Sequence, residues 1–101
     1  MGTALSSGLV AVTSATQVGH TGKQKLNSIT AIGDGTNAAT VTVYDNGSAA
    51  ASGTVLAQAV VAASTTNRTV SIVFNTPVRA DNGLVIVVAG TGAQGHITYG
   101  G

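Results

Sequence analysis

Apolar and polar residues alternate in short stretches along most of the chain. In residues 40–44 (TVTVY), Val41 and Val43 alternate with threonine and tyrosine. In residues 69–74 (TVSIVF), apolar residues recur at positions 70, 72 and 74. Successive side chains of a β-strand point to opposite faces of its sheet, so a period of two indicates strands with one buried face. The pattern predicts that both valines, and the apolar residues of the second stretch, face a core.

Turn-forming residues separate these stretches. Each predicted turn contains glycine, asparagine, aspartate or proline, which tolerate positive φ or fix the turn. The predicted turns are 19–22, 33–35, 45–53, 63–67, 75–77, 81–83 and 90–94. The predicted strands are 9–13, 25–32, 40–44, 54–61, 68–74, 78–79, 84–89 and 95–99. Many short strands with such punctuation are typical of an all-β protein. We therefore expect a small antiparallel β-sandwich, jelly-roll-like, with about seven or eight strands.

Three segments depart from simple alternation. Residues 84–88 (LVIVV) are apolar at every position, which predicts a central strand covered on both faces. Leu26 and Ile29 are three residues apart, and this spacing predicts a bulge near residues 27–28. Residues 55–63 contain four alanines and a glutamine and are the best helical candidate. We assign them to a strand, because the neighbouring segments leave room for hairpin pairing.

The length of the chain, 101 residues, corresponds to a single domain. We assign residues 1–7 to an N-terminal arm and residues 8–101 to one β-sandwich domain. Hydrophobic residues make up 44% of the chain, but only one phenylalanine, two tyrosines and no tryptophan are present. Much of the apolar content is alanine, which buries little area. We therefore expect a thin core that gains from burying more surface against a partner or against further copies of the chain.

Charged residues are sparse, at 7% of the chain, and the formal net charge is +1. The cations are Lys23, Lys25, Arg68 and Arg79, and the acids are Asp34, Asp45 and Asp81. So small a net charge gives no long-range attraction for nucleic acid or for an anionic membrane, and it favours association. The longest apolar run, residues 84–89, is too short to span a bilayer. Composition therefore favours a subunit of an assembly, with no nucleic acid and no membrane as partner.

Residues with metal-binding chemistry are few. His20 and His96 are candidate ligands, but a metal site needs three or four convergent groups, and the chain has no cysteine. The aspartates that could join them lie in predicted turns, where aspartate is expected to form local hydrogen bonds. Residues 33–37 (GDGTN) are rich in the oxygen ligands of calcium, although the spacing of an EF-hand loop is absent. We therefore predict no metal site and no cofactor.

Known catalytic motifs do not match this sequence. It has no Gly-x-Ser-x-Gly elbow, and because it has no glutamate a glycosidase would need two of the three aspartates. Residues 90–95 (GTGAQG) have the G-x-G-x-x-G spacing of a dinucleotide-binding fingerprint, but the segment that follows is predicted as a strand, whereas the fingerprint opens a helix. We predict that the protein is not an enzyme, and we assign no catalytic or cofactor-binding residue.

Other binding functions have weak sequence support. A sugar site would use an aromatic platform, for which Tyr44 and Tyr99 are the candidates. Single-stranded nucleic acid needs stacking rings and a basic groove, which the sequence does not suggest. Residues 1–6 match the myristoylation pattern, which we interpret as a chance match. Asn46 and Asn67 match the glycosylation acceptor pattern, which we take only as a sign of exposed polar turns.

Three motifs give the chain a recognisable pattern. They are Thr-Val-Tyr-Asp at 42–45, Thr-Pro-Val-Arg at 76–79 and Gly-Leu-Val-Ile at 83–86, and the pattern extends over residues 24–101. In this arrangement the chain resembles small β-sandwich structural proteins of tailed-bacteriophage virions, of the capsid decoration or cement type. The shared motifs are mainly short strand and turn segments, and the resemblance carries over no catalytic residue.

The resemblance implies a specific role. We expect a non-enzymatic virion protein that is made in the host cytoplasm and binds the major capsid protein on the outer surface of the capsid, as a homotrimer that stabilises the head. The N-terminal arm could add a strand to a neighbour's sheet or lie along the capsid. One alternative is a structural subunit of the tail, neck or fibre. Another is a lectin-like carbohydrate-binding module.

Overall fold

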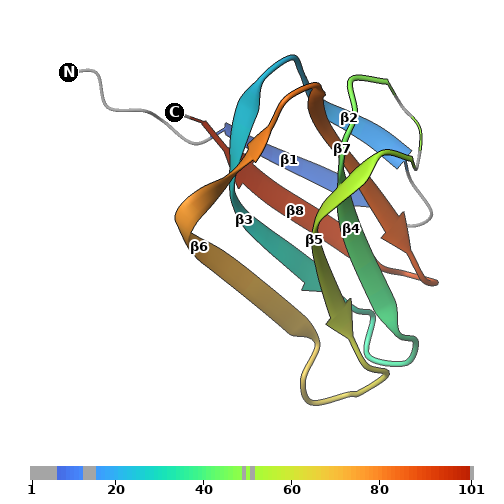
Figure 1. The fold of residues 1–101 in the computed structure, drawn as a ribbon. Helices are drawn as coiled ribbons and strands as arrows, with labels where there is room; N and C mark the ends of the chain where they lie inside the picture. Colours follow the sequence, from blue (N-terminus) through green and yellow to red (C-terminus); the bar gives the residue numbers. More distant parts are fainter. Residues whose placement is uncertain (1–6, 13–15, 49, 51, 101) are drawn as a thin grey trace.

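Strands make up all the regular secondary structure in the part of the chain that the computed structural model describes, which is residues 7–12, 16–48, 50 and 52–100. Figure 1 shows their course. The strands are β1 (Ser7–Val12), β2 (Thr16–Thr21), β3 (Gln24–Ile32), β4 (Ala39–Asp45), β5 (Thr54–Val61), β6 (Thr69–Ala80), β7 (Gly83–Ala89) and β8 (Gln94–Tyr99). The predicted arm lies outside the described residues except for Ser7, which begins β1. Within the described residues, no helix is long and apolar enough to cross a membrane.

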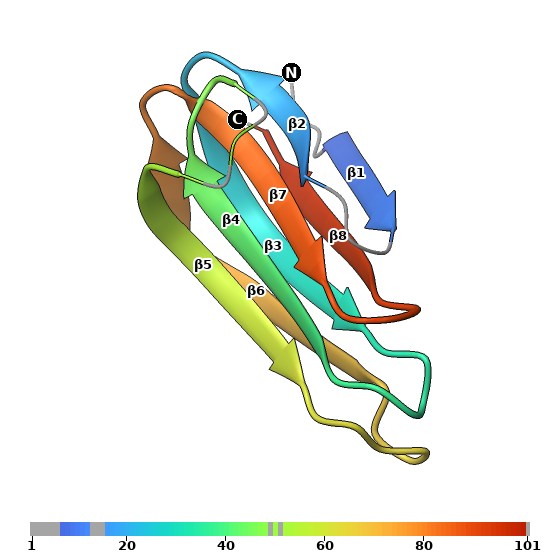
Figure 2. The same ribbon diagram turned by 90° about the vertical axis from the view of Figure 1, so that its right-hand side faces the viewer.

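The strands form two antiparallel sheets that pack face to face (Figure 2). The order is β1-β8-β3-β6 in one sheet and β2-β7-β4-β5 in the other. The pairing is nested, because β4 pairs with β5, β3 with β6, β2 with β7 and β1 with β8. The prediction of an all-β antiparallel sandwich is confirmed. A jelly-roll-like winding requires nested pairing of this kind, and the winding itself stays a prediction.

The core between the two sheets consists of aliphatic side chains. Its largest fully buried members are Leu26, Ile29, Leu84, Ile86, Ile97, Val41, Val43, Val61 and Val88. Phe74 and Tyr99 pack against this cluster but are only partly buried. The inward direction predicted for Val41 and Val43 is confirmed, and no described aromatic side chain is fully buried. The absence of large rings from the described centre agrees with the expectation of a thin core.

Strand β7 occupies the centre of its sheet, between β2 and β4. Leu84, Val85 and Ile86 are each fully buried. Leu84 and Ile86 belong to the core cluster between the sheets, whereas Val85 lies on the opposite face between Val18 and Tyr44 of the neighbouring strands. The all-apolar run therefore forms a central strand with burial on both faces, as the sequence predicts.

Strand β6 replaces two predicted strands with one, and the turn predicted at 75–77 is wrong. The chain bulges at these residues and then continues along β3. Val73 lies opposite Ser28 before the bulge, and Val78 lies opposite Leu26 after it. A proline at the bulge suggested a turn, but β6 is an edge strand, where proline is tolerated because one side makes no ladder bonds.

The bulge predicted in β3 is confirmed. The register of β3 shifts between Leu26 and Ser28 against both β6 and β8. Against β8 the extra residue is Asn27 on β3, which explains the spacing of three between the inward-facing Leu26 and Ile29. Against β6 the extra residues are on β6, where residues 74–77 face Asn27. One irregularity in the sequence pattern thus corresponds to one irregularity in the sheet.

The position of β6 at the edge explains the exposure of Ile72. The alternation predicts that Ile72 faces the core, and it lies opposite the fully buried Ile29. Ile72 is nevertheless 37% exposed, because within the described residues β6 has a neighbour on one side only. The pattern predicts the direction of this side chain but not its depth.

Strand β2 is absent from the sequence prediction, which places a turn at 19–22. The strand extends to Thr21, and its register against β7 shifts between Val18 and His20. A glycine at position 19 and this irregularity interrupt the alternation that would indicate a strand. The turn itself is shorter than predicted and lies between β2 and β3.

Candidate functional site

The loop between β3 and β4 folds around the carboxylate of Asp34. Its Oδ1 accepts hydrogen bonds from the backbone N–H groups of Thr36 and Asn37, each at 2.8 Å, and its Oδ2 accepts one from the Asn37 side-chain amide at 3.0 Å. These donors, the Asn37 backbone first, lower the pKa of Asp34 from 3.8 to about 2. Both carboxylate oxygens are therefore engaged by N–H groups, and the loop gives no support to a calcium site at residues 33–37.

Arg68 joins this loop to the loop between β5 and β6. Its Nη2 donates a hydrogen bond to the backbone carbonyl of Asp34 at 2.6 Å. The backbone N–H of Gly33 donates in turn to the carbonyl of Arg68 at 2.7 Å. Arg68 and Asp34 thus fix the geometry of two loops at one end of the sandwich.

Asp45 has an equivalent role at the other end of the molecule. It ends β4, and its carboxylate accepts hydrogen bonds from the backbone N–H groups of Asp81, Asn82 and Gly83 at 3.2, 2.8 and 3.3 Å. Desolvation raises the pKa of Asp45, but the three N–H donors together outweigh it, so the pKa lies below its usual value. The side chain therefore links the end of β4 to the turn between β6 and β7.

Asn46 shapes the loop that follows β4. Its Oδ1 accepts a hydrogen bond from the backbone N–H of Ser48 at 2.9 Å, and its Nδ2 donates to the carbonyl of Ser52 at 3.1 Å. β4 ends at Asp45 and β5 begins at Thr54, so the turn predicted at 45–53 is confirmed over 46–53, apart from residues 49 and 51, which lie outside the described residues. The loop is held by its own polar side chains, as asparagine in a turn commonly does.

The candidate metal ligands are placed on different sheets. His20 lies on β2 and His96 on β8. The ring of His20 packs edge-on against Tyr99, with ring centroids 5.6 Å apart and an interplanar angle of 64°. Across the described residues, no three His, Cys, Asp or Glu side chains come together as a metal site. The packing of His20 on an aromatic ring gives it a structural role.

The two tyrosines proposed for sugar binding are also separated. Tyr44 lies on β4 and Tyr99 on β8, in opposite sheets, and both are partly buried. Tyr99 packs against the core. The structure does not combine them into one aromatic platform.

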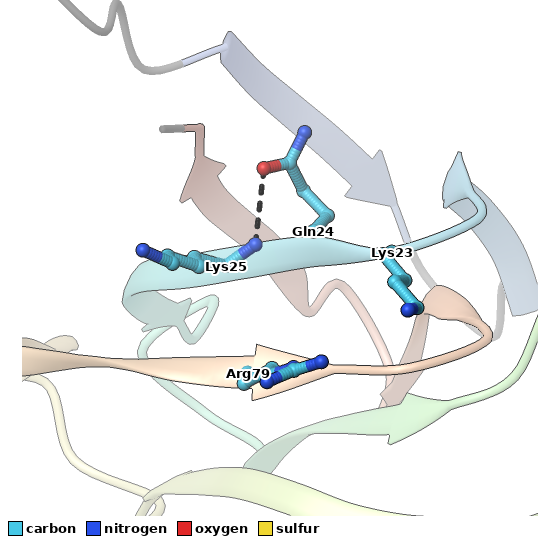
Figure 3. A pocket seen from close by; sticks show the side chains of 4 residues that line it. All are labelled: Lys23, Gln24, Lys25 and Arg79. Atoms are coloured by element: carbon cyan, nitrogen blue, oxygen red, sulfur yellow. Dashed lines mark hydrogen bonds between the residues drawn. The ribbon is translucent and has the colours of Figure 1, made fainter.

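A basic hollow lies where β3 begins and β6 ends. It is lined by Lys23, Gln24, Lys25 and Arg79 and has a volume of about 390 Å³ (Figure 3). Lys23 is in the turn between β2 and β3, Gln24 and Lys25 begin β3, and Arg79 is near the end of β6. Three of the four cationic side chains of the chain therefore gather at one place.

Sequence reasoning missed the basic hollow. Lys23 and Lys25 are close in the sequence, but Arg79 joins them only through the pairing of β3 with β6, in which Lys25 lies directly opposite Arg79. The predicted turn at 75–77 concealed this pairing. Because β4 and β5 separate β3 from β6 in the sequence, no local pattern brings Arg79 to the two lysines.

The outer face of the β1-β8-β3-β6 sheet carries a row of hydroxyl groups. Ser28 and Thr98 share a hydrogen bond of 2.5 Å, and Thr30 and Ser71 share one of 3.0 Å. These pairs join side chains of adjacent strands, β3 with β8 and β3 with β6. Cross-strand pairs of this type stabilise a sheet and give this face a polar surface.

The apolar surface lies on the two edge strands β5 and β6. Among the residues whose side-chain exposure the structure describes, which do not include those of β1, the exposed large hydrophobic side chains are on these strands: Val55 at 52%, Val60 at 54%, Ile72 at 37% and Val73 at 74% exposed. Figures 1 and 2 show β5 and β6 along the same side of the sandwich, each at the edge of its sheet. We call these four residues and their two strands the β5/β6 edge.

The chain was compared with models of protein families, with curated proteins and with solved structures, and none of these comparisons gives a match. The resemblance to virion proteins therefore stays a prediction from the motifs.

Proposed function

We propose that this chain is a non-enzymatic structural subunit of a tailed-phage virion, a decoration or cement protein that binds the major capsid protein on the outside of the head. The observation that carries the proposal is the β5/β6 edge. It places the exposed large hydrophobic side chains, among those whose exposure is described, on two edge strands that each pair with a neighbour on one side only.

An edge strand presents free N–H and C=O groups, and natural proteins usually protect it with charge or with a covering segment. β5 carries no charged residue, and the only charge on β6 is Arg79. An apolar and nearly uncharged edge is the kind of surface that associates with another protein. We infer that the β5/β6 edge is covered in the assembled particle.

The polar groups of the loops also support a structural role. Asp34 and Asp45 hold turns through N–H donors, and Arg68 fastens two loops together. Side chains that hold turns and loops together by hydrogen bonds give a rigid scaffold. A rigid sandwich suits a subunit that must keep its shape on the surface of a particle.

The proposed assembly is a homotrimer on the capsid surface. A specific interface buries on the order of 1,200–2,000 Å² in total, which the long edge strands and their neighbouring faces can provide. A subunit of the tail, neck or fibre would use the same edge, so the β5/β6 edge does not favour one location over the other. The motif resemblance is what leads us to the head.

The proposal is tested by locating the subunit on the particle. Electron microscopy of intact virions should show density of this fold on the outer capsid surface, and the purified protein should rebind shells from which it has been stripped. Val60→Ser together with Val73→Ser should reduce rebinding, whereas Thr91→Ser in the exposed turn between β7 and β8 should not. Thermal unfolding of both variants checks that they are folded.

If the density is found on the tail alone, the protein is a structural subunit of the tail and does not decorate the head. A protein that is found on neither part, and that does not rebind shells, would contradict the proposal as a whole.

A further inference from the structure

The basic hollow concentrates charge in a molecule that has little. Lys23, Lys25 and Arg79 line it, whereas the fourth cation, Arg68, is at the other end of the sandwich and bonded to the Asp34 carbonyl. We propose that the hollow binds carboxylate groups of an acidic segment in a protein partner. In the function proposed above, this partner is the major capsid protein, and the inference rests on that proposal for the partner's identity.

The pairing of β3 with β6 places two cations against each other. Lys25 and Arg79 are directly opposite in the antiparallel register. Like charges in this position destabilise a sheet, and the usual arrangement is a pair of opposite charges. An anion bound between them would remove the repulsion, so the site gains more from a negative ligand than two isolated cations would.

The cations of the hollow keep donors for a ligand. The Gln24 Oε1 accepts a hydrogen bond from the backbone N–H of Lys25 at 3.0 Å, and Figure 3 shows the Gln24 side chain on the other side of β3 from Lys23 and Arg79, so the cations supply the donors. Asp81 contacts Arg79 only at Nε, at 3.2 Å, which leaves the terminal N–H groups of the guanidinium. Figure 3 shows Lys23 projecting from its turn toward the strand that carries Arg79. A ligand rich in acceptors fits this lining.

The form of the site favours a carboxylate over a nucleic acid. The guanidinium fork matches the two oxygens of a carboxylate, and a volume of about 390 Å³ is in the range of small-ligand sites. The lining contains no aromatic ring on which a base could stack. One or two acidic side chains satisfy the hollow and need no such ring.

The test uses the full chain and a fluorescent hexaglutamate peptide, with binding followed by anisotropy at low ionic strength. Hexaglutamine and single-stranded oligothymidylate are measured beside it. Lys25→Gln should weaken hexaglutamate binding about tenfold, which corresponds to the loss of one strong charge-assisted contact. Arg68→Gln removes the same charge outside the hollow and should change the affinity by less than about twofold, since distant exposed charges are screened.

Three results would each overturn the inference. They are binding of hexaglutamate no tighter than hexaglutamine, an equal loss in Arg68→Gln and Lys25→Gln, or tighter binding of oligothymidylate. The two proposals fail separately. If the protein rebinds stripped shells but does not bind the peptide, only the inference of an acidic partner segment is wrong. If it binds the peptide but does not rebind shells, only the proposed capsid role is wrong.

Discussion

At the scale of single residues, the carboxylates of Asp34 and Asp45 hold turns in place by accepting backbone hydrogen bonds. Asp45 accepts hydrogen bonds from three backbone N–H groups of the β6–β7 turn, far away in the sequence. Such a carboxylate satisfies donors that would otherwise depend on water, and it fixes the turn relative to β4. The contribution of Asp45 to stability should therefore exceed that of an exposed aspartate in an ion pair.

The substitution Asp45→Asn tests this role. The amide keeps one acceptor oxygen and loses the other, so the free energy of unfolding should fall by about 1 kcal/mol, the value of one hydrogen bond. Asp81→Asn is the matched control. It breaks an ion pair with Arg79 whose side chains are 68% and 65% exposed, and should cost no more than about 0.5 kcal/mol. Urea unfolding at neutral pH measures both, and equal losses would contradict the assignment.

The lowered pKa values predict how stability depends on pH. A carboxyl group whose pKa is lower in the folded state contributes stability that is fully present above the pKa of the unfolded chain. That contribution is lost as the pH falls through the folded pKa. For Asp34 this range runs from 3.8 down to about 2, and the pKa of Asp45 is lowered in the same direction. We expect the free energy of unfolding to decrease over this range.

Denaturant unfolding at several pH values measures this decrease, and Asp34→Asn should make it shallower by removing one titrating group. A parent protein whose stability is constant from pH 5 to pH 2 would show that the hydrogen bonds of Asp34 and Asp45 do not persist in solution.

The sequence could predict part of this residue chemistry. A local hydrogen-bonding role was expected for aspartates in turns, and Asp34 has that role, with partners two and three residues away. The partners of Asp45 are 36 to 38 residues away, and they become neighbours only when the β6–β7 turn packs against the end of β4. No local pattern contains that information.

At the scale of elements, the turns depend on glycines in different ways. Gly22 and Gly90 both have positive φ, 91° and 116°. A Cβ at position 22 would meet no atom within 4 Å, whereas one at position 90 would overlap the carbonyl oxygen of Ala38. The first glycine serves only its own backbone conformation, and the second also permits the close approach of the β3–β4 loop.

Alanine substitution separates these two contributions. Gly22→Ala should cost about 1–2 kcal/mol, the penalty of a left-handed conformation for an L-residue. Gly90→Ala should cost clearly more, because the backbone around Ala38 must also move. Thermal or urea unfolding compares the two variants. If both variants lose the same free energy of unfolding, the backbone around Ala38 moves away from the new Cβ at no cost in stability.

The pairing of Lys25 with Arg79 gives a prediction of opposite sign. Lys25→Gln removes a like-charge contact between β3 and β6, so the free ligand-less protein should be more stable by a few tenths of a kcal/mol. The gain should shrink as salt is added, because the charges are screened. Lys23→Gln, which removes a charge before β3 begins, is the control. A loss of stability in Lys25→Gln would show that Lys25 has a favourable contact in the fold.

Pattern reasoning predicted the elements unevenly, for physical reasons. Strands β4 and β7 were predicted within one residue at each end, because one alternates cleanly and the other is a short apolar run. Strand β2 was missed because a glycine and a register shift break its pattern, and β6 was divided at its bulge. Burial on an edge was overestimated at Ile72, since alternation gives direction alone.

At the scale of the whole molecule, the sparse charge and the β5/β6 edge point to association. The composition already predicted a subunit of an assembly, but it could not say which surface would be covered. The structure places Val55 and Val60 on the edge strand β5, and it places Val73 on β6 opposite Ser28, at the edge of the face that carries the hydroxyl pairs. The basic hollow was equally hidden, because it depends on the register of β3 with β6.

The last prediction concerns the oligomeric state. If the β5/β6 edge is the contact between copies, the parent protein should sediment as a concentration-dependent oligomer, with the trimer as the proposed form. Val73→Asp should shift it to monomers, because a carboxylate buried in an interface without a partner is costly. Val73 is 74% exposed in the single chain, so the substitution should change the stability of the monomer little.

Thr91→Asp introduces the same charge in the exposed turn between β7 and β8, away from this edge, and gives the same net charge. It should leave the oligomer intact, which separates a specific contact from a general effect of charge on association. Sedimentation equilibrium of the three proteins decides the matter. A parent that stays monomeric at high concentration would contradict self-association, and two aspartate variants that dissociate alike would place the contact elsewhere than on the β5/β6 edge.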